Sequence, residues 1–202
     1  MQNFEFNHVY ALALNHAHSF IVLDLLQEMT THSPETYAHT IRVCLIAYDF
    51  GEFLGFTDAQ LELIFDAALV HDLGKLKTPT TILHKHGKLE PIERQVMSEH
   101  VKHTYQIARG IKSLETATMV GGLHHERWDG NGYPFRLKGD EIPFIAQVLA
   151  IVDTWDAMVS DRSYRKGMPK KKAADLLLTE KNRGQFSPTL VELFLSYVEA
   201  QN

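Results

Sequence analysis

The chain has 202 residues, a formal net charge of −5 and 45% hydrophobic residues. This length suits one domain that can bury a full core. The acidic balance argues against a nucleic-acid polymer as the main partner, because such proteins usually carry a basic face. The N-terminus lacks a signal-peptide pattern, and every apolar run is shorter than the roughly 20 residues that span a bilayer. We therefore expect a cytoplasmic protein that does not associate with a membrane.

Apolar residues recur at helical spacing along nearly the whole chain, which predicts an all-α bundle. Ser33 and Pro34 form an N-cap followed by a proline, the usual start of a helix, here predicted to run to about Gly51. Thr57 and Gln60 form a capping box at the start of the next helix. Further helices are predicted over residues 4–29 (one or two), 91–110, 113–126, 144–159, 169–181 and from 188 to the C-terminus.

The new start at Ser33 suggests two parts, a short N-terminal helical extension over residues 1–31 and a main domain over 32–202. The extension is predicted to support a homodimer or to bind a signalling partner. Two long connections, 74–90 and 127–143, are punctuated by glycine and proline. Such loops carry function more often than packing.

Twelve histidines are more than a chain of this size usually carries. Several of them, with carboxylates, lie in or at the ends of otherwise apolar helices: Glu35, His39, His71, Asp72, His100, His124, His125 and Asp153. A single helical histidine is usually a satisfied core residue, and Asp153 taken alone is explained equally well by an interhelical salt bridge. Together, the eight residues indicate metal binding, since a buried carboxylate must be paired or must coordinate an ion.

Mixed imidazole and carboxylate ligands suit iron, manganese or zinc. Eight ligands are too many for one ion, which takes about four to six. We therefore expect two or three divalent ions that share a bridging carboxylate, and Asp72 is the residue predicted to bridge them.

Several motifs make the pattern more specific: "HDLGK" at 71–75, "HHERWDGNGYP" at 124–134, "IVDTWDAMVSDRSYR" at 151–165, His39-x-x-Arg42 and His100. They resemble the HD-GYP family, a branch of the HD metal-dependent phosphohydrolases whose characterised members hydrolyse cyclic di-GMP. The resemblance extends from about Glu35 to Pro188, with the motifs in family order. "HD" alone is a weak signal, whereas its combination with the long GYP motif is a strong one.

The resemblance implies iron, or manganese, as the metal, and it places ligands at His39, His71, Asp72, His100, His124, His125 and Asp153. In members with a third ion, an acidic residue one helical turn before the first histidine also binds, and Glu35 occupies that place. A first-turn carboxylate favoured by the helix dipole explains Glu35 equally well. Both interpretations of Glu35 stay open.

Two ions roughly 3.5–4 Å apart activate a shared water and neutralise phosphate charge. Asp72 is accordingly a predicted catalytic residue. Lys75 is predicted to be a second, because its point charge can contact the scissile phosphate and stabilise the developing negative charge. The alternative for Lys75 is a solvated cation at a helix C-terminus.

Substrate contacts are predicted in two segments. In the GYP turn, Gly132 permits close backbone approach and Tyr133 offers a flat face for a guanine. After Asp153, the expected substrate contacts are Asp156, Arg162 and Arg165. The arginines suit bidentate phosphate binding, and the family pattern has basic substrate-binding residues at both positions.

The expected activity is hydrolysis of cyclic di-GMP to the linear dinucleotide pGpG, with GMP as a further product. One alternative is a scaffold that retains the pocket and binds partners without turnover. Two others are a phosphodiesterase for a different cyclic dinucleotide and a general HD nucleotidase that acts on another phosphate ester, although the complete GYP loop speaks against the nucleotidase. None of the family's metal ligands is missing, which favours the enzyme.

Overall fold

The computed structural model describes residues 19–161 and 166–201. Within these ranges the secondary structure is helical, with no strand, which confirms the all-α prediction. The elements are α2 (Ser19–His32), α3 (Pro34–Phe53), α4 (Asp58–Val70), η1 (Leu73–Lys77), α5 (Thr80–Leu83), α6 (Pro91–Ser98), α7 (His100–Ala108), η2 (Lys112–Leu114), α8 (Glu115–Gly121), η3 (Gly139–Glu141), α9 (Phe144–Val159), α10 (Lys170–Arg183) and α11 (Pro188–Ala200).

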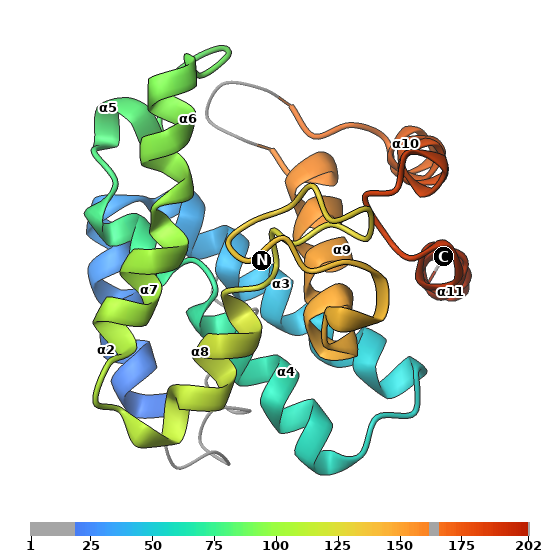
Figure 1. The fold of residues 1–202 in the computed structure, drawn as a ribbon, viewed down its shortest axis with the longest axis horizontal. Coiled ribbons are helices and arrows are strands. Elements are labelled where there is room, and N and C mark those ends of the chain that lie inside the picture. The colour runs from blue at the N-terminus through green and yellow to red at the C-terminus, as the bar shows by residue number, and fades with distance from the viewer. Residues whose placement is uncertain (1–18, 162–165, 202) are drawn as a thin grey trace.

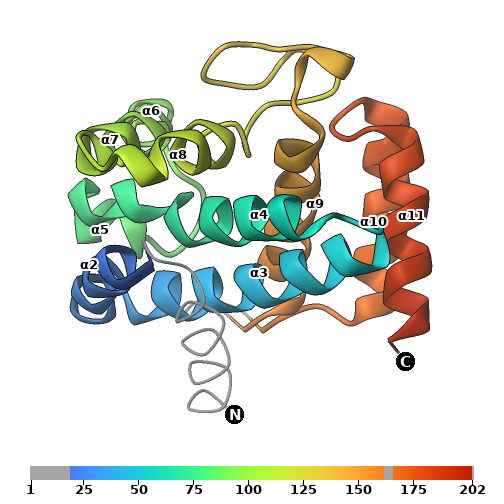
Figure 2. The same ribbon diagram turned by 90° about the horizontal axis from the view of Figure 1, so that it is seen from below.

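Helices α3 and α4 pack along each other in the middle of the molecule, and α9 packs against both. Figure 2 shows α10 and α11 at one end of this pair, and α2, α5, α6 and α7 toward the other. The buried faces are apolar, and the largest fully buried side chains include Phe50, Phe65 and Phe194. Burial of such rings supplies much of the driving force for folding.

Two predicted helix starts are confirmed. The Ser33 hydroxyl accepts a hydrogen bond from the Thr36 amide at 3.2 Å, and Pro34 opens α3. At the start of α4, the Thr57 amide donates to the Gln60 side chain at 3.0 Å, as a capping box requires. These caps satisfy amides that have no partner inside the helix.

The helix predicted over residues 91–110 is two helices, α6 and α7, which meet at Glu99. At the junction, side chains bond to backbone carbonyls, although the Glu99 amide still donates to the Gln95 carbonyl at 3.3 Å. The Ser98 hydroxyl donates to the Gln95 carbonyl at 2.7 Å, and His100 Nδ1 lies 2.7 Å from the Met97 carbonyl. Such local bonds compete with the helical ladder.

The helix predicted over residues 113–126 is also shorter than expected, because α8 ends at Gly121. Two consecutive glycines weaken the helix, and His124 Nδ1 lies 2.6 Å from the Gly121 carbonyl. His124 and His125 therefore lie in a turn that follows the helix rather than in the helix itself.

The connection predicted over residues 74–90 contains η1 and α5. Gly74 lies so close to α7 that a Cβ there would overlap the backbone carbonyl of His100. This contact brings the start of η1 against the start of α7, and the two elements pack together.

Helix α2 packs against α3 and η1. The predicted helix over residues 4–29 lies in part outside the described residues, so only its portion from Ser19 onward is seen. No described helix combines the length and apolarity that a bilayer-spanning segment needs.

Candidate metal centre

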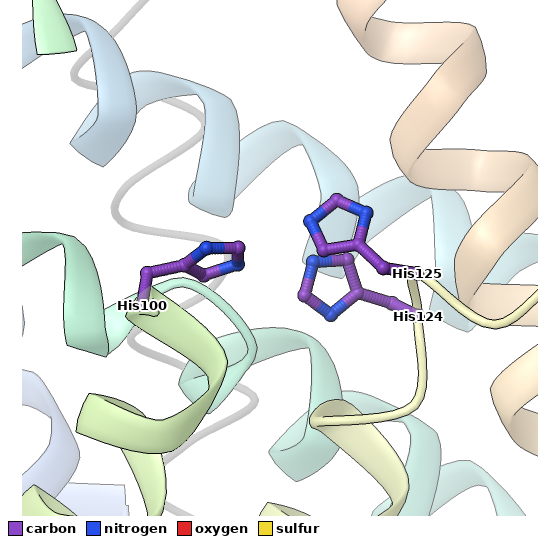
Figure 3. A group of neighbouring side chains, drawn as sticks. All are labelled: His100, His124 and His125. Atoms are coloured by element: carbon purple, nitrogen blue, oxygen red, sulfur yellow. The ribbon is translucent and has the colours of Figure 1, made fainter. Parts of the chain in front are cut away.

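Five segments that are far apart in the sequence bring predicted ligands to one place. His39 comes from α3, His71 and Asp72 from the end of α4, and His100 from the first residue of α7. The turn after α8 supplies a histidine pair, and α9 supplies Asp153. Figure 3 shows His100 facing the pair His124 and His125 from the opposite side.

Asp72 lies at the middle of this cluster with its side chain only 1% exposed. Its two carboxylate oxygens face different histidines. Oδ2 lies 3.4 Å from His71 Nε2 and 3.9 Å from His39 Nε2, whereas Oδ1 lies 3.5 Å from His100 Nε2 and 4.0 Å from His124 Nε2. A carboxylate placed in this way can bind one ion through each oxygen.

Three of the histidines are held by backbone carbonyls three residues earlier in the chain. The Nδ1 atoms of His71, His100 and His124 lie 2.6, 2.7 and 2.6 Å from the carbonyls of residues 68, 97 and 121. A carbonyl only accepts, so each ring donates from Nδ1, which leaves Nε2 as the nitrogen that can bind a metal. This is how protein structures commonly orient metal-ligating histidines.

Several polar atoms in the cluster are buried without a hydrogen-bond partner: His71 Nε2, Asp72 Oδ1 and His100 Nε2. Native proteins rarely leave such atoms unsatisfied, and an ion is one explanation when they are found. Ligand atoms lie within 4.8 Å of one another in three overlapping groups: His39 with His71 and Asp153, His71 with Asp72 and His124, and His100 with His124 and His125. The residues therefore fit a centre that binds divalent metal.

The electrostatics of His100, His124 and Asp72 agree with this fit. For His39, burial alone would lower the pKa, but the hydrogen bonds to Asp153 and Asp156 outweigh that effect and raise it. Burial lowers the pKa of His100 to about 4 and that of His124 to about 3, so both imidazoles are neutral at neutral pH. Burial alone would raise the pKa of Asp72, but Lys75 and His71 outweigh it and hold that pKa well below its usual range. Neutral imidazoles and an ionised carboxylate are the forms that bind a cation.

The eighth predicted ligand, Glu35, lies in the first turn of α3, one turn before His39. Among the described residues, none of the three ligand groups includes it. Its assignment to a third ion stays a prediction.

Lys75 lies beside the cluster, with Nζ 2.6 Å from Asp72 Oδ2 and its side chain 20% exposed. Because η1 begins at Leu73, directly after Asp72, this short helix places the Lys75 side chain next to the Asp72 carboxylate. The ammonium group is therefore within reach of an anion bound at Asp72 and also of solvent.

Asp156 was expected to contact substrate, but its carboxylate is 1% exposed and its oxygens already accept hydrogen bonds from His39, Arg42 and Ser160. Burial alone would raise its pKa, but His39 and Arg42 outweigh that effect and lower it. These contacts connect Asp156 to the metal cluster through His39 and occupy both of its oxygens, so its contact with a substrate stays a prediction.

The GYP turn folds back over the histidine pair. The Tyr133 ring stacks on the His125 ring with centroids 4.7 Å apart, and the Tyr133 amide donates to the His125 carbonyl at 3.2 Å. Gly132 is needed for this approach, because a Cβ there would lie 2.6 Å from the His125 carbonyl oxygen. Gly132 and Tyr133 therefore lie beside the candidate ligands, and their contact with a substrate stays a prediction.

A cavity of about 220 Å³ borders the cluster. Its walls include both histidines of the pair, Tyr133 and Gly132 of the turn, Thr154 of α9 and Gln185 of the turn before α11. Aromatic and amide groups of this kind suit a nucleobase, which offers a flat face and hydrogen-bonding edges. The two predicted arginines, Arg162 and Arg165, lie outside the described residues.

The sequence interpretation gave no role to Glu126, although it stands inside the GYP motif. Its buried carboxylate accepts backbone hydrogen bonds from residues 135, 136 and 137 at 2.6, 3.1 and 3.1 Å, which fixes the far side of the loop. In the sequence, Glu126 follows directly after two candidate ligands, but no local pattern predicts which groups it bonds to. Arg42 is likewise part of a motif, and the sequence again held no local pattern that assigned it a role.

The HD domain family model matches residues 24–190. Among curated proteins, the chain is 36% identical over 179 residues to a 3′3′-cGAMP-specific phosphodiesterase 2 of Vibrio cholerae, covering 88% of this chain and 34% of that protein. It is 37% identical over 180 residues to a cyclic di-GMP phosphodiesterase of Thermotoga maritima, covering 87% and 48%. The chain thus spans about a third to a half of the relatives it matches.

A solved structure of an HDG"Y"P protein from Bdellovibrio bacteriovorus has a similar fold, with a TM-score of 0.66 at 21% identity over 80% of this chain and 52% of that one. The family match covers most of the sequence, and the helices that carry the cluster lie within it. The chain therefore belongs to the HD domain family, in the HD-GYP branch whose motifs it carries.

Proposed function

We propose that the protein is a metal-dependent phosphodiesterase that opens cyclic di-GMP to pGpG, with GMP as a further product. The observation that carries this proposal is the position of Asp72, whose two oxygens face two histidine groups next to a cavity walled by Tyr133. Relatives named as cyclic di-GMP phosphodiesterases support the same reading.

The centre would hold at least two divalent ions, with iron favoured and manganese next. One ion would be held by His39, His71, Asp72 and Asp153, and the other by Asp72, His100, His124 and His125. Glu35 is the candidate ligand for a third ion. Bound metal supplies an activated water and a positive field for the phosphate.

The chain's own residues would orient the phosphodiester and stabilise its charge. Lys75 Nζ, held beside Asp72, would contact the non-bridging phosphate oxygens as negative charge grows on them. Water adds to phosphorus, the bond from phosphorus to the ribose 3′ oxygen breaks, and that oxygen takes up a proton. The product keeps a 5′-phosphate.

Substrate recognition is assigned to the walls of the cavity. Tyr133 and Gly132 would hold the base and its ribose, and Arg162 and Arg165 would bind phosphate. We also assign partner binding or homodimerisation to the N-terminal helices. Neither the arginines nor the first 18 residues belong to the described part of the chain.

A second candidate substrate is 3′3′-cGAMP, favoured by the Vibrio cholerae relative named as specific for it. The two cyclic dinucleotides differ in one base. The base contacts in the cavity therefore decide between them.

The test is anaerobic purification, loading with Fe²⁺ or Mn²⁺, and incubation with cyclic di-GMP, 3′3′-cGAMP or cyclic di-AMP, with products identified by chromatography. We expect pGpG from cyclic di-GMP, and loss of both metal and turnover in Asp72→Ala. Asp140→Asn, an exposed carboxylate in the loop before α9, is the matched control and should behave as wild type. Tight binding of the dinucleotide without turnover by metal-loaded protein would instead show a scaffold.

A further inference from the structure

The buried carboxylate of Asp156 lies beside the metal cluster and contacts His39, Arg42 and Ser160. It belongs to α9, three residues after Asp153, and is 1% exposed. Its Oδ2 lies 2.6 Å from His39 Nδ1 and accepts from an Arg42 Nη atom at 2.9 Å. Its Oδ1 accepts from Arg42 Nε and from the Ser160 hydroxyl, both at 2.7 Å.

His39 is thereby held differently from the other oriented histidines. The Nδ1 atoms of His71, His100 and His124 face neutral backbone carbonyls, whereas that of His39 faces an ionised carboxylate. A carboxylate partner fixes the ring and also increases the electron density on the opposite nitrogen, which makes the imidazole a stronger metal ligand. His39 Nε2, the opposite nitrogen, lies 2.8 Å from Asp153 Oδ1 inside the cluster.

Arg42 holds this carboxylate in place from the same helix as His39. It lies one turn after His39 on α3 and grips both oxygens of Asp156, a bidentate geometry that only a guanidinium provides. An ionised carboxylate buried without such a partner would be very costly. Arg42 therefore helps to fix the orientation of His39, because it holds the Asp156 carboxylate that His39 faces.

We propose that Asp156, clamped by Arg42, is a positioning residue that sets the metal affinity of one half of the centre. That half is formed by His39, His71, Asp72 and Asp153, and it contains the one carboxylate-oriented histidine among the described ligands, whereas His100 and His124 in the other half are oriented by backbone carbonyls. This inference rests on the proposed metal centre. It predicts that replacing Asp156 or Arg42 weakens the binding of one ion more than the binding of the other.

The variant Asp156→Asn tests this asymmetry. It keeps the shape of the side chain, but its NH₂ group faces a donating Arg42 nitrogen in either orientation, and it also faces His39 when it takes the place of Oδ2. Equilibrium dialysis of Mn²⁺ should show two binding steps in the wild type. In the variant we expect one step weakened by about 10- to 100-fold, with the other unchanged.

Two further measurements separate positioning from general damage. Turnover of Asp156→Asn should recover at high Mn²⁺, because the reacting groups are intact. Arg42→Lys, which keeps the charge but loses the paired hydrogen bonds, should weaken the same step to a smaller extent, and it serves as the test if Asp156→Asn does not fold. Asp161→Asn, an exposed carboxylate paired with Lys166, is the matched control and should leave both steps unchanged.

Equal weakening of both steps, or wild-type binding in folded Asp156→Asn and Arg42→Lys, would overturn the inference. If the wild type binds two ions and hydrolyses its substrate while the variants match it, only this inference fails. If the wild type binds no ion, the proposed metal centre itself is refuted, and this inference with it.

Discussion

At the scale of single residues, the chemistry depends on the directions in which side chains point. Residue type and motif spacing predicted which histidines and carboxylates gather. They did not predict that Asp72 turns one oxygen toward His71 and the other toward His100, or that Asp156 accepts a hydrogen bond from His39. The contacts of Asp72 with His100 and of Asp156 with His39 join residues 28 and 117 positions apart, and no local pattern contains that information.

Replacement of Lys75 should affect the rate more than metal binding. In Lys75→Gln we expect kcat to fall by about 100- to 1,000-fold, because one preorganised charge at the developing oxyanion is lost. Metal content should stay at the wild-type level, since the ammonium group donates to Asp72 and binds no ion. Steady-state kinetics with metal analysis on the same samples checks both points.

The matched control is Lys77→Gln, an exposed lysine on the same short helix whose Nζ lies 3.4 Å from Gln106. It should retain wild-type kinetics. Equal activity in Lys75→Gln and Lys77→Gln would support the alternative that Lys75 is only a helix-terminal cation.

At the scale of elements, most helices could be predicted because their start signals are local. Ser33 and Thr57 begin α3 and α4 as their sequence patterns indicate. The early end of α8 has a local signal in the consecutive glycines Gly121 and Gly122, whereas the break at Glu99 has none of this kind. In both places the side chain of a candidate ligand, His100 or His124, also bonds to a backbone carbonyl.

The GYP loop depends on Glu126, and Glu126→Gln should loosen it. The glutamine offers one acceptor where the carboxylate offers two, so at least one of the three backbone amides at 135–137 loses its partner. A hydrogen bond to a charged group contributes about 1.5–3 kcal/mol, so amide exchange there should quicken by more than about tenfold. KM for the dinucleotide should rise while metal content is unchanged.

Glu141→Gln is the control for this loop. Its exposed carboxylate accepts the Lys138 amide at 2.8 Å, next to the same loop in the chain. Unchanged exchange at 135–137 in Glu126→Gln would show that the loop is held by other contacts, such as the Tyr133 stack on His125.

At the scale of the whole molecule, the candidate metal centre is formed by segments that lie far apart in the sequence. His39 and Asp153 are 114 residues apart, yet their polar atoms lie 2.8 Å from each other. The resemblance of motifs predicted that they meet, whereas composition and periodicity alone did not. An ion held between α3, α4, α7 and α9 would act as a cross-link in the folded state.

Metal removal should therefore lower the thermal stability of the protein. A ligand present at 100 times its Kd stabilises the folded state by about 2.7 kcal/mol, which corresponds to roughly 5–10 °C in Tm for a domain of this size. Differential scanning calorimetry before and after chelation should show this decrease. The decrease should be reversed by Mn²⁺ and absent in Asp72→Ala.

The most direct measurement is anomalous diffraction from crystals of the iron- or manganese-loaded protein, recorded on both sides of the metal absorption edge. We expect two peaks roughly 3.5–4 Å apart, one on each side of the Asp72 carboxylate, as a two-metal site requires. A map with no peak at Asp72, or with a single ion that leaves His39 and Asp153 uncoordinated, would contradict the account.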